Sequence, residues 1–241
     1  MHWSFALLIA YVGYVGFRVG GEGGALWSIA FMLTCFTCIV LHELGHSFTA
    51  MRFGISIRRI LVMPIGGMAE FDSIPRLPRQ ELLITVAGPA VNFTIAALLW
   101  TLSSELAPAA SSTPASLREF GWLLMWTNVW FGCFNLTPAF PMDGGRIVRA
   151  LLAYRLPYVR ATFWAATIGK VVAVIGIGIG VYFQLWLLVA LFIFILSVGE
   201  IEYRSVRVQE RHAAEWAAIA DRFNRVGRGE LPPEPPLLGP N

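Results

Sequence analysis

Long apolar runs alternate with short polar segments along most of the chain. Six of these runs are candidate membrane spans, covering approximately residues 3–20, 25–51, 82–103, 119–137, 162–182 and 185–203. A helix needs about 20 mostly apolar residues to cross a bilayer, so the first run is marginal and the other five suffice. The pattern therefore predicts an all-α polytopic membrane protein with about six transmembrane helices.

The overall composition agrees with this fold class. The chain is 56% hydrophobic and 14% charged, with a mean hydropathy of +0.64, whereas soluble domains carry about 25% charged residues. The first run lacks the basic residues that open a secretory signal peptide, so we treat it as a span. We expect residues 1–203 to form a single membrane domain, because no internal repeat or second folded domain is visible.

Arginines gather on one side of the predicted membrane. Five lie between the second and third runs, four between the fourth and fifth, and six more follow from Arg204 to Arg228, whereas the other side has only Arg18 and Arg118. By the positive-inside rule, both termini are expected in the cytoplasm and the protein in the cell membrane. The net charge of +3 thus reflects topology, and we expect no nucleic-acid partner.

Two segments outside the spans have their own patterns. Residues 55–72 mix β-branched residues with Pro64 and the pair Gly66-Gly67, which predicts a short membrane-associated β-hairpin or loop. One interpretation is a plain connector; the other is a strand edge that holds an unwound substrate through main-chain hydrogen bonds. Residues 204–241 begin with a polar helical pattern and end in LPPEPPLLGPN, which we expect to be disordered.

The motif HELGH (42–46) lies near the end of the second run. Histidines four residues apart project from one face of a helix, so His42 and His46 can bind one metal ion, usually zinc, with Glu43 beside it to act on a water molecule. Two histidines and a glutamate in hydrocarbon would be costly without a metal or polar partners. The sequence therefore predicts a metal site inside the membrane.

A third ligand is expected, because catalytic zinc normally takes three protein ligands and leaves one position open. The chain has three aspartates, Asp72, Asp143 and Asp221. Asp143 follows the fourth run in NLTPAFPMDGGR (135–146), at the same depth as the histidines. The prolines of this segment stop regular helix, and a broken helix end at membrane depth is tolerated where it lines a cavity.

Other polar residues in the spans admit more than one interpretation. Asn92, in AGPAVNF (87–93), is either a structural clamp or a contact for substrate or oxyanion. Cys35 and Cys38 could supply soft ligands, but we favour packing residues. For Lys170 we favour a structural role, either reaching the cytoplasmic surface or pairing with Glu200.

These motifs together resemble one family. HELGH, the glycine-pair loop, GPAVN (88–92) and NLTPAFPMDGG (135–145) occur in the order typical of the site-2 protease family of intramembrane zinc metalloproteases, and the similarity covers roughly residues 25–160. The short six-span form is the most similar. Many relatives carry CBS modules after the last span or a PDZ domain between spans. The 38 residues after Tyr203 and residues 52–81 are too few for these modules, so we expect neither of them in this chain.

The resemblance implies one zinc ion per chain, bound by His42, His46 and Asp143, with Glu43 as the general base. It also implies that Asn92 and Asn135 lie near the substrate, and the strand-edge interpretation adds Gly66 and Gly67. The expected function is cleavage of transmembrane segments of other membrane proteins near the cytoplasmic face. The alternatives are a metal-binding or metal-transporting membrane protein, and an inactive relative that acts as a scaffold.

Overall fold

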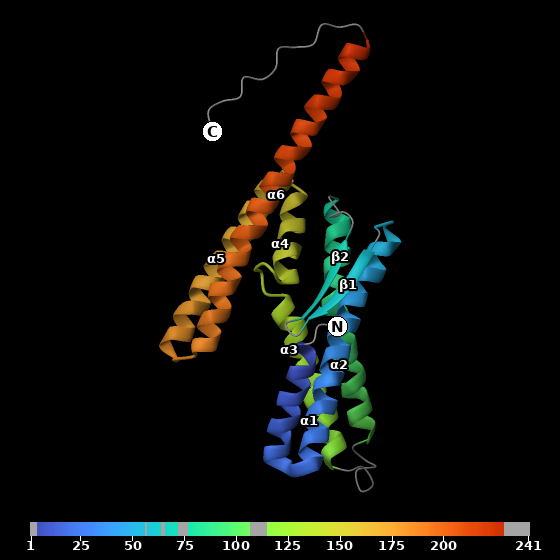
Figure 1. Cartoon of the computed structure of the whole chain (residues 1–241), viewed down its shortest axis with the longest axis vertical. Helices are drawn as coiled ribbons and strands as arrows, with labels where there is room; N and C mark the ends of the chain where they lie inside the picture. The colour runs from blue at the N-terminus through green and yellow to red at the C-terminus, as the bar shows by residue number, and fades with distance from the viewer. Residues whose placement is uncertain (1–3, 56, 64–65, 72–76, 107–114, 229–241) are drawn as a thin grey trace.

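The computed structural model describes residues 4–55, 57–63, 66–71, 77–106 and 115–228. Within them the chain is mainly helical, with one two-stranded sheet (Figure 1). The elements, in chain order, are α1 (Ser4–Arg52), β1 (Ile57–Met63), β2 (Gly66–Phe71), α2 (Pro78–Leu106), α3 (Ala115–Asn135), α4 (Asp143–Ala153), α5 (Tyr158–Tyr182) and α6 (Trp186–Gly227).

Helix α1 is folded back on itself. Its helical geometry breaks at Gly20 and at Gly21, where φ is 61° and ψ is −149°, a conformation that essentially only glycine adopts. A Cβ on Gly16 would overlap Gly24, so the two arms run closely side by side around this break. Figure 1 shows the first arm descending and the second returning beside it. The second arm carries the HELGH motif.

Four described helices are long and apolar enough to cross a membrane: α1, α2, α5 and α6. Helix α3 has 21 residues but is less apolar than these four helices, because it contains Arg118, Glu119 and Asn128. The prediction of a helical membrane protein is confirmed at this level. Part of the connection between the fourth and fifth predicted spans forms the short helix α4, which the sequence analysis did not predict.

The strands β1 and β2 pair in antiparallel register, with Met63 opposite Gly66 and Val62 opposite Gly67. They lie within 55–72, the segment for which the sequence predicts a hairpin or loop. Both strands contact α1, and Figure 1 shows them beside its second arm. Residues 64 and 65, which connect them, lie outside the described part.

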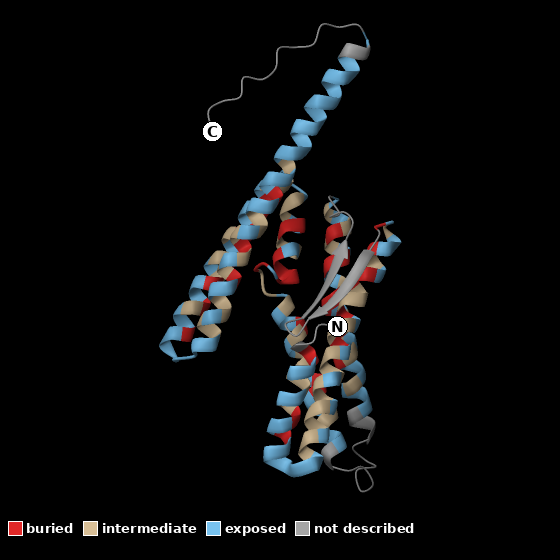
Figure 2. Ribbon diagram, viewed as in Figure 1, coloured by how far each residue is buried: buried red, intermediate tan, exposed pale blue. Residues whose placement is uncertain are grey.

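The molecule is apolar outside and packed through small residues inside. Large side chains such as Leu187, 87% exposed, and Trp130, 71% exposed, lie on outer faces, and buried positions are confined to the inward faces (Figure 2). Small residues are buried along α5: Ala165, Gly169, Ala173, Gly176 and Gly180. Gly176 lies against Phe192 of α6, so these small residues let the two helices pack closely.

Two ion-pair systems connect the helices. Lys170 of α5 pairs with Glu200 of α6 at 2.5 Å, which is one of the two structural roles that the sequence left open. Arg149 of α4 lies 2.6 Å from the carboxylate of Glu81 in α2 and 2.7 Å from that of Glu202 in α6. Burial lowers the pKa of the Arg149 guanidinium, but the carboxylates raise it by more and keep it above its usual value. Arg149 therefore clamps α4 between α2 and α6.

Candidate metal centre

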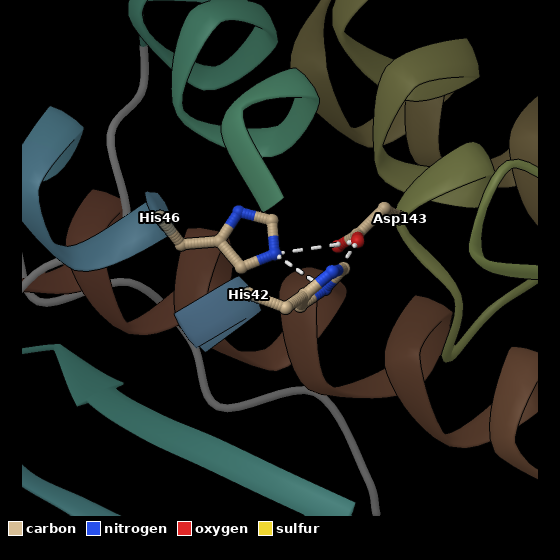
Figure 3. Close-up of side chains that lie close together, drawn as sticks. All are labelled: His42, His46 and Asp143. Carbon is tan, nitrogen blue, oxygen red and sulfur yellow. Dashed lines mark hydrogen bonds and ion pairs between the residues drawn. The ribbon is translucent and has the colours of Figure 1, made fainter. Parts of the chain in front are cut away.

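His42 and His46 lie one turn apart on the second arm of α1, with their rings nearly perpendicular at 86°. Their side chains are buried, and their Nε2 atoms are 3.1 Å apart. Figure 3 shows both rings directed toward the same point, which Asp143 approaches from α4. The spacing that the sequence analysis used thus brings both histidines to one place.

Asp143 is the first residue of α4 and reaches both histidines. Its Oδ2 lies 3.2 Å from Nε2 of His42 and 3.3 Å from Nε2 of His46. The glycines after it make this approach possible, because a Cβ on Gly144 would overlap the carbonyl groups of the turn that follows α3, and one on Gly145 would lie 2.7 Å from the backbone nitrogen of Phe140. The DGG motif therefore folds α4 tightly against the preceding turn, with the carboxylate facing α1.

The Nδ1 atom of each imidazole, on the side away from Asp143, already has a hydrogen-bond partner. Nδ1 of His46 lies 2.8 Å from the carbonyl oxygen of Ile84 in α2. A carbonyl only accepts, so Nδ1 carries a proton, and in the neutral ring that a metal ion requires Nε2 then holds a free lone pair. Nδ1 of His42 lies 2.6 Å from Oδ1 of Asn92 and donates in the same way. Both Nε2 lone pairs therefore face Asp143.

This arrangement brings three hydrogen-bond acceptors together in a buried place. Oδ2 of Asp143 is buried and receives no hydrogen bond within the described part of the chain, which is costly unless a cation is present. The three distances of 3.1, 3.2 and 3.3 Å match the edge of about 3.3 Å of a tetrahedral ion with bonds of about 2.0 Å. The group could thus hold one metal ion, and its donor set suits zinc.

Glu43 follows His42 directly in α1 and is half-buried. Its carboxylate is close enough to interact electrostatically with both histidines and Asp143, and with Arg146 one turn further along α4. It is not needed as a ligand, because the other three groups already face one another. A carboxylate beside such a centre can act as a general base.

Helix α2 approaches the histidines at a glycine. A Cβ on Gly88 would overlap Nε2 of His46 and lie 2.7 Å from Nε2 of His42. On the facing helix, a Cβ on Gly45 would lie 2.9 Å from the carbonyl oxygen of Ala87. The two helices therefore cross closely at Gly45 and Gly88, and any side chain at position 88 would enter the metal centre.

The remaining predicted site residues lie at different distances from this centre. Asn92 contacts the centre through Nδ1 of His42. Asn135 ends α3 and is half-buried; no hydrogen bond joins it to the histidines or Asp143 among the described residues. Gly66 and Gly67 open β2, outside the ligand group. Their roles in substrate binding stay predictions.

Two other candidate ligands, Asp221 and Cys38, have other partners, and Asp72 lies outside the described residues. Asp221 is exposed on α6, where it pairs with Arg225 at 2.9 Å. Sγ of Cys38 accepts a hydrogen bond from Asn128 at 3.4 Å. This contact agrees with the packing role that the sequence analysis favoured for Cys38.

Two parts of the site were not predicted from the sequence. Asn128 of α3 is fully buried and bonds to Asn92 at 3.3 Å; a polar residue inside the fourth apolar run was the available signal. The carbonyl of Ile84 that fixes His46 has no sequence signature, although it directly precedes the carbonyl of Thr85, which Pro89 leaves without its helical donor.

Gly88→Ala is expected to lower the affinity of this group for a metal ion, because the added methyl overlaps both coordinating nitrogens. Overpacking of this kind costs about 1–3 kcal/mol, which corresponds to a roughly 5- to 150-fold weaker affinity. Competition with a chelator in detergent solution measures it. Gly178→Ala on α5, where a Cβ meets nothing within 4 Å, is the matched control. An unchanged metal affinity in Gly88→Ala would contradict the geometry.

Comparison with known proteins identifies relatives of this chain. The family model described as Peptidase family M50 matches residues 30–113 and 104–176. A zinc metalloprotease of Methanocaldococcus jannaschii is 37% identical over 213 residues, which make up 87% of this chain and 58% of that relative. Stage IV sporulation protein FB of Bacillus subtilis is 29% identical over 131 residues, 54% of this chain and 43% of that protein. The chain thus spans about half the length of these relatives.

A solved structure agrees with the sequence matches. The site-2 protease from Methanocaldococcus jannaschii has a TM-score of 0.59 and 35% sequence identity, and the match covers 82% of this chain and 87% of that one. The residues matched by the family model include His42, His46 and Asp143, and they extend from α1 into α5. With more than half of its residues matched, the chain belongs to peptidase family M50.

Proposed function

We propose that this protein is an intramembrane zinc metalloendopeptidase that cleaves transmembrane segments of other membrane proteins near the cytoplasmic face. The observation that carries the proposal is the group of three buried acceptor atoms, 3.1 to 3.3 Å apart, with Glu43 directly beside them. Membership of peptidase family M50 and a relative named as a zinc metalloprotease support it.

In this proposal Nε2 of His42, Nε2 of His46 and a carboxylate oxygen of Asp143 hold the zinc ion. Bound zinc supplies a Lewis acid that polarises the scissile carbonyl and lowers the pKa of a water molecule. Glu43 accepts the proton of the attacking water and delivers it to the leaving amide nitrogen, so that the peptide bond breaks into an acid and an amine. A metal transporter would place its ligands along a path, whereas these form a single group.

We propose six spans: the two arms of α1, and α2, α3, α5 and α6. The arginine-rich segments favour a cytoplasmic location for both termini by the positive-inside rule. His46 then lies about 9 Å along α1 from Arg52, at a rise of 1.5 Å per residue. This short distance supports a metal centre inside the bilayer but near its cytoplasmic surface.

The domain organisation proposed for the chain remains one membrane domain, residues 1–203, followed by a cytoplasmic tail. Helix α6 continues without interruption to Gly227, which agrees with the polar helical pattern of the tail. The Pro-rich part, for which the sequence predicts disorder, lies outside the described residues.

We further propose that the substrate is bound in extended form beside α1. Peptide bonds are shielded within a helix, so a transmembrane substrate must unwind before it is cut. The strands β1 and β2 contact α1, which carries the HELGH motif, and each pairs with only one neighbour in the described sheet. An unwound segment can add to the outer edge of such a sheet, with Asn135 as a further polar contact.

Glu43→Gln should abolish cleavage of a model transmembrane substrate while zinc stays bound, because the base is lost and the ligands are kept. The expected rate loss is about 100-fold or more. Asp143→Ala should lose both zinc and activity, and Asp221→Ala, on the exposed part of α6, should keep both. The zinc content per chain is measured by elemental mass spectrometry, and the cleavage rate is measured by gel electrophoresis. Wild-type cleavage by Glu43→Gln would remove Glu43 from the mechanism.

Gly67→Val should raise the KM for a transmembrane substrate several-fold without changing zinc content. The reason is that a branched side chain next to the strand edge hinders the close approach of an unwound segment. Ala69→Val, two residues further along β2, is the matched control because it adds bulk to the same strand away from the glycine pair. Equal kinetics for Gly67→Val and the wild type would make the hairpin a simple connector.

A further inference from the structure

A chain of buried hydrogen bonds leads from His42 to helix α3. Nδ1 of His42 lies 2.6 Å from Oδ1 of Asn92, and Nδ2 of Asn92 donates to Oδ1 of Asn128 at 3.3 Å. Nδ2 of Asn128 donates to the carbonyl oxygen of Leu124 at 2.9 Å and to Sγ of Cys38 at 3.4 Å. Both asparagines are almost fully buried, with 1% and 0% exposure.

The donor and acceptor roles along this series of hydrogen bonds are fixed at Asn128. The carbonyl oxygen of Leu124 can only accept, so the Asn128 amide must present its nitrogen there and its oxygen to Asn92. Asn92 then has to donate through Nδ2, which leaves its oxygen as the acceptor for His42. It follows that the neutral ring of His42 carries its proton at Nδ1 and keeps the lone pair of Nε2 for a metal ion.

The two histidines are thus held by different means. His46 donates to a backbone carbonyl, that of Ile84, which no substitution removes. His42 depends on two side chains from two other helices, Asn92 of α2 and Asn128 of α3. Of the two histidines, only His42 is therefore held by a contact that a side-chain substitution can remove.

We infer that Asn92 and Asn128 are positioning residues that set the tautomer and ring orientation of His42 for metal binding. This inference rests on the proposed function, because it concerns the same zinc ion. Asn92 contacts Nδ1, which lies on the opposite side of the imidazole from the coordinating Nε2, and its buried amide is engaged at both ends. Of the two roles that the sequence left open for Asn92, the contacts favour the clamp over a substrate contact.

Removal of these hydrogen bonds is expected to lower the affinity for a metal ion. Hydrogen-bond partners behind a metal ligand typically contribute about 10- to 100-fold to affinity. Asn92→Leu keeps the volume roughly constant, removes the acceptor, and lets the His42 proton move to Nε2. Asn92→Asp restores an acceptor for Nδ1–H and should recover most of the affinity.

Zinc affinity of the full chain in detergent, measured by competition with a chelator, tests the inference without any substrate. We expect zinc binding to weaken about 10- to 100-fold in Asn92→Leu and less in Asn128→Leu, which only loosens the Asn92 amide. The double variant should be no weaker than Asn92→Leu, because Asn128 acts through Asn92. Thr94→Val, on an exposed position of α2 whose hydroxyl bonds only its own helix, should match the wild type.

Two results would overturn the inference. One is wild-type zinc affinity in Asn92→Leu together with a raised KM, which would make Asn92 a substrate contact. The other is full additivity in the double variant, which would mean that Asn128 acts independently of Asn92.

A measurement on the unaltered protein covers the case in which Asn92→Leu does not fold. In metal-free protein labelled with ¹⁵N-histidine, NMR should show the neutral His42 ring with its proton at Nδ1, and a neutral ring with its proton at Nε2 would contradict the inference. Wild-type protein that binds no zinc would instead count against the proposed function, and the NMR result would still decide the role of the asparagines.

Discussion

One face of helix α2 positions the whole metal centre. Its four contributing positions lie within an arc of about 80° at 100° per residue: Glu81, Ile84, Gly88 and Asn92. Glu81 binds Arg149 and so holds α4, which carries Asp143. The carbonyl of Ile84 fixes the ring of His46, and Asn92 fixes that of His42. Gly88 leaves space for both rings. The ligands come from α1 and α4, and their positions therefore depend on how α2 packs against these two helices.

The membrane makes this dependence strict. A buried polar group without a partner costs several kcal/mol in hydrocarbon, and the side chains of Asn92, Asn128 and Arg149 near the site each pair with another element. Arg149 is shared between Glu81 and Glu202, and Asn128 uses both hydrogens of its amide nitrogen. These contacts replace the large apolar core of a soluble enzyme, because here the large apolar side chains face outward and the helices pack through small residues.

The sequence predicted those parts of the site that have a local pattern. Histidines four residues apart must share a helix face, and DGG after two prolines indicates a broken helix end, so His42, His46 and Asp143 could be brought together without coordinates. Helix α4 was missed because it is too short for a span. Asn128 was missed because its partner is 36 residues away, and the carbonyl of Ile84 was missed because backbone groups are the same at every position. The clamp at Asn92 was one of two open interpretations, and only the contacts could separate them.

X-ray absorption at the zinc edge of the purified wild-type protein tests the central claim most directly, because it reports the ligand atoms themselves. If His42, His46 and Asp143 bind the ion, the first shell contains only nitrogen and oxygen, four atoms at about 2.0–2.1 Å, with the outer-shell scattering of two imidazoles. A sulfur atom at about 2.3 Å would mean that Cys38 leaves Asn128 and replaces Asp143. Such a shell would contradict the arrangement that α2 imposes.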